Sequence, residues 1–311
     1  MDCICIVGDV TDSGCSNATQ ISKYAEAIQP SNVAPTYALS GNHDCTTSGF
    51  TAQALENWKS YTIDVIKSVY QGSSTPAVTY SDSKLAFWFK KKVGNTNKYD
   101  YFIFLGMNVW NFSSSVFLNA DIQFVSNLLN GEASTARCFI FTHPFFPDRA
   151  GNFQNLYTSS NLLSGSQLAT LTNLCDSHPN TIWFSGHSHW KQYLADQDPT
   201  SNDYRGLYAN IWHEQAGGTG GWTVHVSSCA YPRDAHYDES QGRWVSDASE
   251  DWTSKASEGT VVDVHENYVD IRGISFKCAW RDGTGDQGYV THYVPSGAYR
   301  VPISAGVPNN P

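Results

Sequence analysis

The chain begins with the stretch MDCICIVGDVTDSG, residues 1–14. Its apolar run Cys3–Val7 has the length and composition of a short buried strand, and the run stops abruptly at Gly8-Asp9. Glycine lets the backbone turn sharply as it leaves the strand, so the carboxylate of Asp9 is delivered to the end of that strand. In an open α/β sheet, the carboxyl ends of strands are where ligand-binding residues converge. The opening stretch therefore predicts an α/β fold with a site at one edge of its sheet.

The rest of the chain extends this pattern. Up to about residue 190, short apolar runs alternate with helix-like stretches, which is typical of an α/β layered fold. We expect strands at Cys3–Val7, Thr36–Leu39, Tyr101–Leu105, Cys138–Thr142 and Thr181–Ser185. We expect helices at Ala18–Ile28, Thr51–Val69, Ala120–Leu129 and Ser166–Cys175.

From about residue 205 the character changes, because strand-like runs alternate with turns rich in Gly, Asp and Ser. One pair of runs predicts a hairpin that turns near Glu266-Asn267. We therefore divide the chain into a core at 1–204, strands at 205–294 that complete the second sheet of the same domain, and a surface-wrapping tail at 295–311.

The composition and net charge of the chain favour some classes of protein and argue against others. Charged residues make up 15% of the 311 residues, against about 25% in typical domains, and Tyr and Trp are abundant, which favours an exported or surface-displayed protein. The net charge of -10 argues against binding to a nucleic-acid duplex. No apolar stretch is long enough to span a bilayer, and the first residues do not have the pattern of an export signal.

The eight cysteines include no Cys-x-x-Cys pair, so they do not form a zinc-ribbon signature. Cys3, Cys5 and Cys138 lie in apolar runs and are interpreted as buried thiols. Disulfides remain open among the other five, which are Cys15, Cys45, Cys175, Cys229 and Cys278.

Four polar motifs each follow a strand candidate. They are Gly8-Asp9-Val10-Thr11-Asp12, Gly41-Asn42-His43-Asp44, Thr142-His143-Pro144 and Gly186-His187-Ser188-His189. Carboxylate, amide oxygen and imidazole are ligands that suit divalent metals such as Mn, Fe or Zn. A carboxylate such as that of Asp9 can bridge two cations about 3.5–4 Å apart, the spacing used by two-metal hydrolases.

In this order, GDxxD, GNHD, a strand-end His and GHxH resemble the calcineurin-like metallophosphoesterase family over about residues 3–190. The resemblance implies a four-layer α/β/β/α sandwich that hydrolyses a phosphomonoester or a phosphodiester with metal-activated water. It implies that Asp9 bridges two metals, that His189 serves one of them, and that the other is completed by Asn42, His143 and His187.

The same resemblance places His43 over the substrate phosphate, as proton donor or transition-state stabiliser, with Asp44 orienting its imidazole. Asp12 is expected to shape the turn or support a ligand, and its presence in place of Tyr argues against the purple acid phosphatase branch. We further consider Arg149 as a phosphate contact or a surface ion pair, and His236 as a loop residue lining the pocket. The expected substrate is a small phosphoester or a nucleotide.

The sequence also departs from the family pattern, which begins with Asp-x-His at the end of an earlier strand. No such motif precedes Cys3, so we expect a fold without its first strand, one complete metal site, and reduced activity for this chain. Two later triplets with Asp-x-His spacing, at 234–236 and 263–265, stay open as substitutes. The alternative is a non-catalytic binding or structural module that keeps the fold within a larger assembly.

Overall fold

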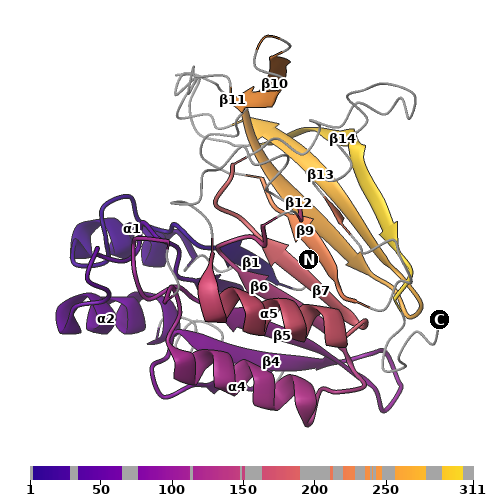
Figure 1. Ribbon diagram of the computed structural model, residues 1–311, viewed down its shortest axis with the longest axis horizontal. Helices are drawn as coiled ribbons and strands as arrows, with labels where there is room; N and C mark the ends of the chain where they lie inside the picture. The colour runs from indigo at the N-terminus through magenta and orange to yellow at the C-terminus, as the bar shows by residue number, and fades with distance from the viewer. Residues whose placement is uncertain are drawn as a thin grey trace.

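The computed structural model describes thirteen parts of the chain. These are residues 3–28, 34–64, 76–112, 115–147, 149–150, 163–189, 211–212, 220–227, 235–238, 240, 243–246, 256–277 and 289–303. They form an α/β structure with a large central sheet, as the sequence predicts (Figure 1).

The opening stretch forms strand β1 (Ile4–Val7), which pairs in parallel with β2 (Thr36–Leu39). Helix α1 (Ala18–Ile28) joins the two strands and buries Ile21, Ala25 and Ile28 on one face. All four residues of β2 are buried, whereas those of β1 are half-buried. Because the strands are parallel, Gly8-Asp9 and Gly41-Asn42 leave the pair at the same edge.

The central sheet has seven strands in the order β3-β4-β5-β6-β7-β9-β8. Their bounds are Thr79–Tyr80 for β3, Ala86–Lys92 for β4, Tyr99–Leu105 for β5, Arg137–Thr142 for β6, Thr181–Ser185 for β7, Ile211–Trp212 for β8 and Trp222–His225 for β9. Neighbouring strands from β5 through β6 and β7 to β9 are parallel, so their carboxyl ends share one edge of the sheet. His143 and Gly186 follow β6 and β7 at that edge.

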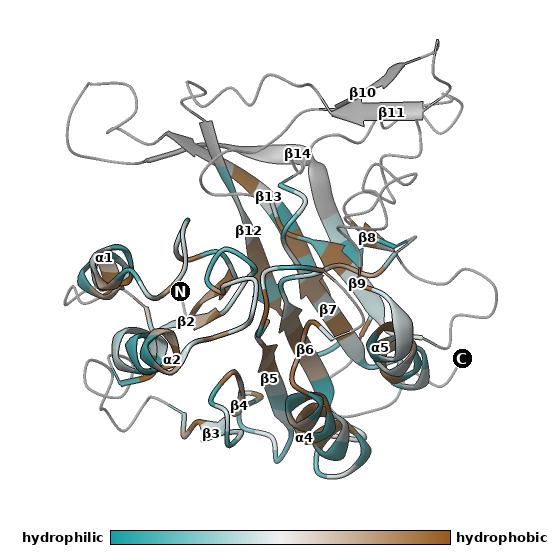
Figure 2. Ribbon diagram, turned by 60° about the vertical axis from the view of Figure 1, so that its left-hand side comes forward, coloured by the Kyte–Doolittle hydropathy of each residue, from teal (hydrophilic) through white to brown (hydrophobic). Residues whose placement is uncertain are grey.

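One face of this sheet is covered by helices α4 (Asn119–Asn130) and α5 (Gly165–Ser177) (Figure 1). Val125 of α4 and Leu171 of α5 belong to the same buried cluster as Ile103 and Ile140 of the sheet. The strands beneath, β5 to β7, are hydrophobic along most of their length (Figure 2). Burial on both faces explains their continuous apolar runs in the sequence.

The other face packs against β1–β2 and a three-stranded antiparallel sheet. This second sheet contains β12 (Ala256–Val264), β13 (Val269–Lys277) and β14 (Tyr289–Val301). Stacked phenylalanine rings cross the central sheet here from strand to strand, with centroids 4.4 to 5.2 Å apart, in the order Phe87, Phe104, Phe141 and Phe184. The α/β class is thus confirmed, while the order of four complete layers stays a prediction.

The second predicted helix differs from the expectation of one run at Thr51–Val69. Helix α2 (Ala52–Trp58) begins where the Thr51 side chain accepts a hydrogen bond from the Ala54 N–H. It then passes into a π-helical segment, η1 (Lys59–Asp64), and residues 65–69 lie outside the described part. The Thr62 hydroxyl donates to the Trp58 carbonyl within this segment, so a side chain competes for a backbone acceptor.

Two expectations for the C-terminal region need correction, although the hairpin at Glu266-Asn267 is confirmed by the pairing of Val264 with Val269. The strands after residue 205 do not complete a single sheet, because β8 and β9 join the central sheet and β10 (Ala235–Asp238) pairs with β11 (Arg243–Ser246). Residues 295–301 are not a surface tail, since they belong to β14.

A buried arginine joins the central sheet to the C-terminal hairpin. Arg137, the first residue of β6, makes a bidentate ion pair with Asp100 at 2.9 and 2.7 Å. Its remaining nitrogen donates to the carbonyl oxygens of His265 at 2.6 Å and Ile303 at 3.1 Å. The hairpin is therefore held at the start of β6, at the edge opposite to His143.

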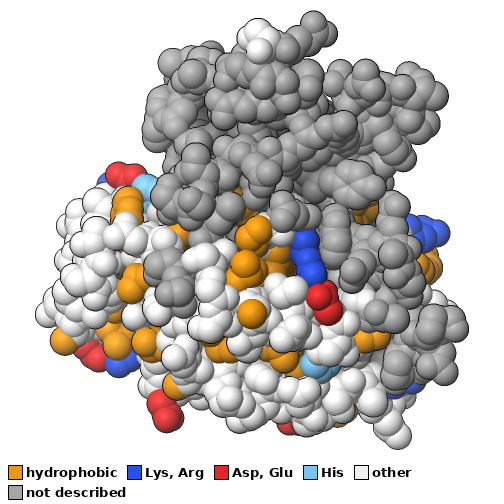
Figure 3. Space-filling model, in the orientation of Figure 1, with side chains coloured by type: hydrophobic (Ala, Val, Ile, Leu, Met, Phe, Trp, Pro, Cys, Tyr) orange, Lys and Arg blue, Asp and Glu red, His pale blue; other side chains and the backbone are white. Residues whose placement is uncertain are grey.

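The described surface agrees with the low charge of the chain. On the face shown in Figure 3, charged side chains occur in scattered spots among uncharged polar and hydrophobic atoms. Among the described helices, none has both the length and the apolar content needed to cross a bilayer. The described cysteines, Cys3, Cys5, Cys15, Cys45, Cys138 and Cys175, are free thiols; Cys229 and Cys278 lie outside the described residues.

Candidate metal centre

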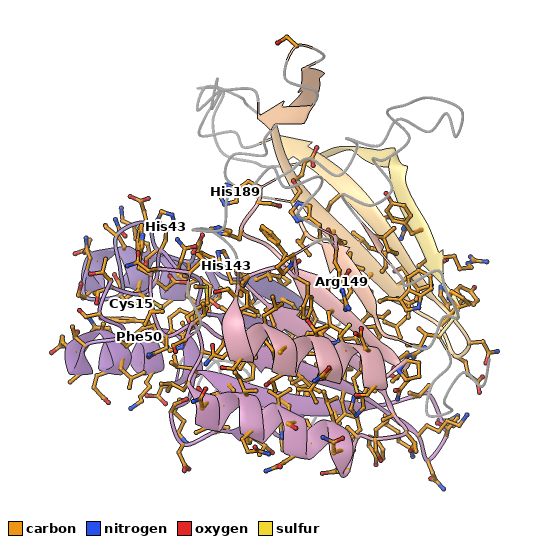
Figure 4. The ribbon with its side chains drawn as sticks, in the orientation of Figure 1. Cys15, His43, Phe50, His143, Arg149 and His189 are labelled. Atoms are coloured by element: carbon orange, nitrogen blue, oxygen red, sulfur yellow. The ribbon has the colours of Figure 1, made fainter. Side chains whose placement is uncertain are left out.

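Four strand ends bring the predicted ligands to one place. Asp9 follows β1, Asn42 follows β2, His143 follows β6 and His187 follows β7. Ligand atoms of Asp9, His143 and His187 all lie within 4.8 Å of one another. In Figure 4, His43, His143 and His189 lie on the same side of the molecule, above the α/β core.

His143 is the centre of this group and is almost fully buried. Its Nδ1 contacts the carbonyl oxygen of Val7 at 2.7 Å, and since a carbonyl only accepts, Nδ1 carries the proton. The other ring nitrogen, Nε2, lies 3.0 Å from Oδ1 of Asn42 and 3.2 Å from Oδ2 of Asp9. Nε2 and the two oxygens all carry lone pairs, so their close approach is favourable only when a proton or a cation lies between them.

The pKa values in this group are set by burial and by the charges that face one another. Burial lowers the pKa of His143, but the carboxylate of Asp9, the Val7 carbonyl and the charge of Asp44 together raise it, so that the pKa lies above its usual value. Burial also raises the pKa of Asp9, yet the charge of His143 holds it well below its usual range. The pKa of His187 is well below its usual value because burial disfavours the imidazolium and His143 repels it.

These residues fit a divalent cation. One carboxylate, one amide oxygen and two imidazoles converge from four strand ends, a donor set that suits Mn, Fe or Zn. A cation held by these residues would take the place of a proton between Nε2 of His143 and the two oxygens. The Val7 carbonyl supports this role, since metal-binding histidines usually donate their other N–H to a fixed acceptor.

The backbone at three predicted ligands is strained. Asp9 has φ 54°, His187 has φ 65° and His189 has φ 60°, all in the left-handed region that non-glycine residues seldom adopt. Such conformations each cost about 1–3 kcal/mol and cluster at functional sites. The surrounding contacts must therefore hold these side chains in place against a local preference.

Two glycines are required by close packing around the ligands. Gly8 has φ 92°, and a methyl group on it would collide with the ring of His143. A methyl group on Gly41 would collide with the carboxylate of Asp9. The glycines of GDxxD and GNHD therefore make room for the ligand of a neighbouring strand.

Asp44 does not take the position that the sequence led us to expect. Its carboxylate is fully buried and accepts hydrogen bonds from the N–H groups of Val10, Thr11 and Gly41, and from the Thr11 hydroxyl, at 2.7 to 3.2 Å. Burial and the charge of Asp9 raise its pKa to about 6. Asp44 therefore ties the GDxxD turn to the GNHD turn instead of orienting the ring of His43.

His43 is held by Asp12 instead. Its Nδ1 lies 2.9 Å from the backbone carbonyl of Asp12, and the Asp12 carboxylate is 3.8 Å away. The backbone N–H of His43 donates to Oδ1 of Asp9 at 2.9 Å. Asp12 thus supports the site through its backbone, and Gln20 of α1 fixes its loop by accepting from the N–H groups of Asp12 and Ser13.

The GHxH loop is pinned by a buried pair that the motif reading overlooked. Ser188, between the two predicted ligands, is fully buried and its hydroxyl lies 3.1 Å from Nδ1 of His225, the last residue of β9. The Gly186 N–H donates to the carbonyl of His143 at 3.1 Å, which joins this loop to the neighbouring ligand. His189 lies outside the group formed by Asp9, His143 and His187.

Two aromatic residues beside the site were also missed. The ring centroid of Trp110 is 4.3 Å from that of His43, and the centroid of Phe112 is 4.3 Å from that of His187. Both follow β5, whose carboxyl end lies at the same edge as those of β6 and β7. In the sequence, their position just after a predicted strand was the signal that could have placed them near the site.

Of the remaining candidates, Arg149 and the triplet at 263–265 lie away from the centre. Arg149 is mostly buried, forms an ion pair with Asp176 of α5 at 2.6 Å, and lies apart from the three labelled histidines (Figure 4). His236 lies in β10, and its side chain is outside the described residues. In the triplet at 263–265, Asp263 pairs with Arg272, and the hairpin lies at the opposite edge of the sheet.

The central α/β sheet thus carries, at one edge, a group of side chains that could hold a metal ion. The family model of calcineurin-like phosphoesterases matches residues 2–191, and the chain belongs to that family. No curated protein matches the chain with significance.

Proposed function

We propose that this protein hydrolyses a small phosphomonoester or phosphodiester at the centre built by Asp9, Asn42, His143 and His187. The observation that carries the proposal is the approach of Asp9 Oδ2 and Asn42 Oδ1 to Nε2 of His143, whose other ring nitrogen faces the Val7 carbonyl. A divalent cation bound there supplies Lewis-acid chemistry, since it neutralises phosphate oxygens and lowers the pKa of water.

The protein's own contribution is binding and orientation. Four strand ends hold the ligands, and Val7, Gly8 and Gly41 fix the ring of His143 and the carboxylate of Asp9. We assign Asp9 and His189 to a second cation, as the family resemblance implies. Low-dielectric surroundings strengthen the interaction of the site with the charge of a phosphate.

His43 is proposed to give a proton to the leaving oxygen. Its Nδ1–H is engaged by the Asp12 carbonyl, so the proton that it transfers is the one on Nε2 of the imidazolium form. Its backbone is tied to Asp9, which places the residue next to the metal ligands without making it one.

The test is an assay of p-nitrophenyl phosphate and bis-p-nitrophenyl phosphate with and without added Mn²⁺. We expect Mn²⁺-dependent release of p-nitrophenol from one of the two esters. His43→Ala should abolish turnover and leave the metal content nearly unchanged. His265→Ala, a histidine at the opposite edge, is the matched control and should retain both.

The same assay separates the non-catalytic alternative. A protein that binds Mn²⁺ but hydrolyses neither ester would support a binding or structural module with the family fold. If His43→Ala loses the metal together with the activity, the role assigned to His43 is wrong.

A further inference from the structure

The segment after β5 is fixed against the metal centre. The Asn108 N–H donates to the carbonyl of Val116 at 2.9 Å, which closes the base of the loop. The Trp110 N–H donates to the carbonyl of Thr46 at 3.0 Å, which ties the loop to the chain just after GNHD. The side chain of Trp110 is thus presented from an anchored backbone.

Trp110 lies beside His43 without being part of the core. Its ring meets the His43 ring at an interplanar angle of 60°, so the two rings are not stacked on each other. The residue is half-buried, and in the described part of the chain it lies outside the three clusters of packed hydrophobic side chains. An aromatic side chain that is anchored, partly open and next to a proposed proton donor suits contact with a substrate.

Phe112 adds a second aromatic ring next to a ligand. It lies tilted by 35° against His187 and packs partly on the core cluster that includes Phe146 and Trp183. Because Phe112 packs against the hydrophobic core, its position has a structural explanation. Trp110 has no such contact in the described part of the chain, so a role in substrate binding is better supported for Trp110 than for Phe112. The two aromatic rings nevertheless lie next to both His43 and His187.

We propose that Trp110, assisted by Phe112, binds a planar aromatic group carried by the substrate of this site. This inference rests on the proposed phosphoester hydrolysis and narrows its substrate to esters with an aryl group or a nucleobase near the phosphate. Aromatic pairs contribute beyond the burial of their area when rings meet in offset or edge-to-face geometry. The proposal makes residues 108–112 a determinant of substrate specificity.

The experiment compares benzyl phosphate with cyclohexylmethyl phosphate, each as the monoester and as the methyl diester. Both release a primary alcohol of similar size, so they differ chiefly in the planar ring. We expect the protein to prefer the benzyl ester in kcat/KM. Trp110→Leu should reduce this preference by about 3- to 10-fold, whereas Trp110→Phe should retain most of it.

A control variant and a binding measurement complete the test. Tyr99→Ala removes an exposed aromatic side chain at the far end of β5, and we expect it to leave the preference unchanged. Bound Mn²⁺ is measured for every variant, so that a loss of metal is recognised. Adenosine 5′-phosphate against ribose 5-phosphate then distinguishes a nucleobase from a simple aryl group.

A second measurement does not depend on hydrolysis. Calorimetry compares the binding of benzylphosphonate and of cyclohexylmethylphosphonate to the Mn²⁺-loaded protein. Tighter binding of benzylphosphonate that Trp110→Leu removes supports the inference even if no ester is hydrolysed, in which case only the proposed function fails. Equal binding of the two phosphonates, or a preference that survives Trp110→Leu, overturns the inference.

Discussion

The Nδ1–H of His143 donates a 2.7 Å hydrogen bond to the carbonyl oxygen of Val7. Val7 is the last residue of β1, and His143 follows β6, so a predicted ligand from the central sheet is oriented by a strand of the two-stranded sheet β1–β2. The next residue, Gly8, lies against the same ring. The candidate metal centre therefore lies where the β1–β2 pair packs on the central sheet, and we expect a change at that contact to weaken metal binding.

Gly8→Ala tests this contact directly. The added methyl group collides with the His143 ring, so we expect the variant to lose Mn²⁺ binding. Gly94→Ala is the matched control, because Gly94 also has a positive φ, 52°, but its added methyl group meets nothing within 4 Å. Calorimetric titration with Mn²⁺ measures both; equal loss in the two variants would mean that backbone strain, and not the contact with His143, causes it.

Asp44→Asn should lower the free energy of unfolding by about 2 kcal/mol. Each carboxylate oxygen accepts two hydrogen bonds, so the amide NH₂ group would have to face donors in either orientation. Urea denaturation measures the change. Asp12→Asn, at a side chain that is 82% exposed, should show none; an Asp44→Asn variant as stable as the parent would refute the structural role of Asp44.

Ser188→Ala should weaken Mn²⁺ binding by about 10-fold, the lower end of what supporting residues contribute at metal sites. The change removes the hydroxyl that holds the GHxH loop on His225 while both flanking histidines stay in place. Ser188→Thr restores the hydroxyl and should recover most of the affinity. Titration with Mn²⁺ gives the dissociation constants, and an unchanged value for Ser188→Ala contradicts the positioning role.

Arg137→Met should destabilise the protein by about 3–5 kcal/mol, since it leaves the carboxylate of Asp100 buried without its partner. Arg300→Met removes a similar bidentate pair with Asp270 at an exposed position of the second sheet, and no measurable change is expected. Chemical denaturation of the two variants compares them. If Arg137→Met is as stable as Arg300→Met, the buried clamp does not hold the hairpin.

Elements with clear boundaries were predictable from the sequence. Helix Ala18–Ile28 and strands Thr36–Leu39 and Thr181–Ser185 match the structure, because polar or turn-forming residues bound each run. Strand β14 escaped prediction because Pro295 and Gly297 interrupt its pattern. In the register, Gly273 pairs with Val294 and Arg272 with Ala298, so the intervening residues form a bulge on this edge strand.

The candidate site was predictable in its motifs but not in its contacts. Strand-end position was enough to bring Asp9, Asn42, His143 and His187 together. Adjacency in the sequence wrongly suggested that Asp44 holds the ring of His43, whereas the two side chains have different partners. The position of Trp110 after β5 was a signal that it lies near the site. Its contact with His43, and that of Ser188 with His225, depend on which strands are neighbours, and no local pattern contains that information.

We propose above all that Asp9, Asn42, His143 and His187 hold a divalent cation. The most direct test of this proposal is the Mn²⁺ content of the protein after dialysis, determined by elemental analysis for the parent, His143→Ala and the control His265→Ala. We expect at least one tightly bound equivalent in the parent and the control, and its loss in His143→Ala. A parent that retains no metal, or a His143→Ala variant that retains as much as the parent, would contradict it.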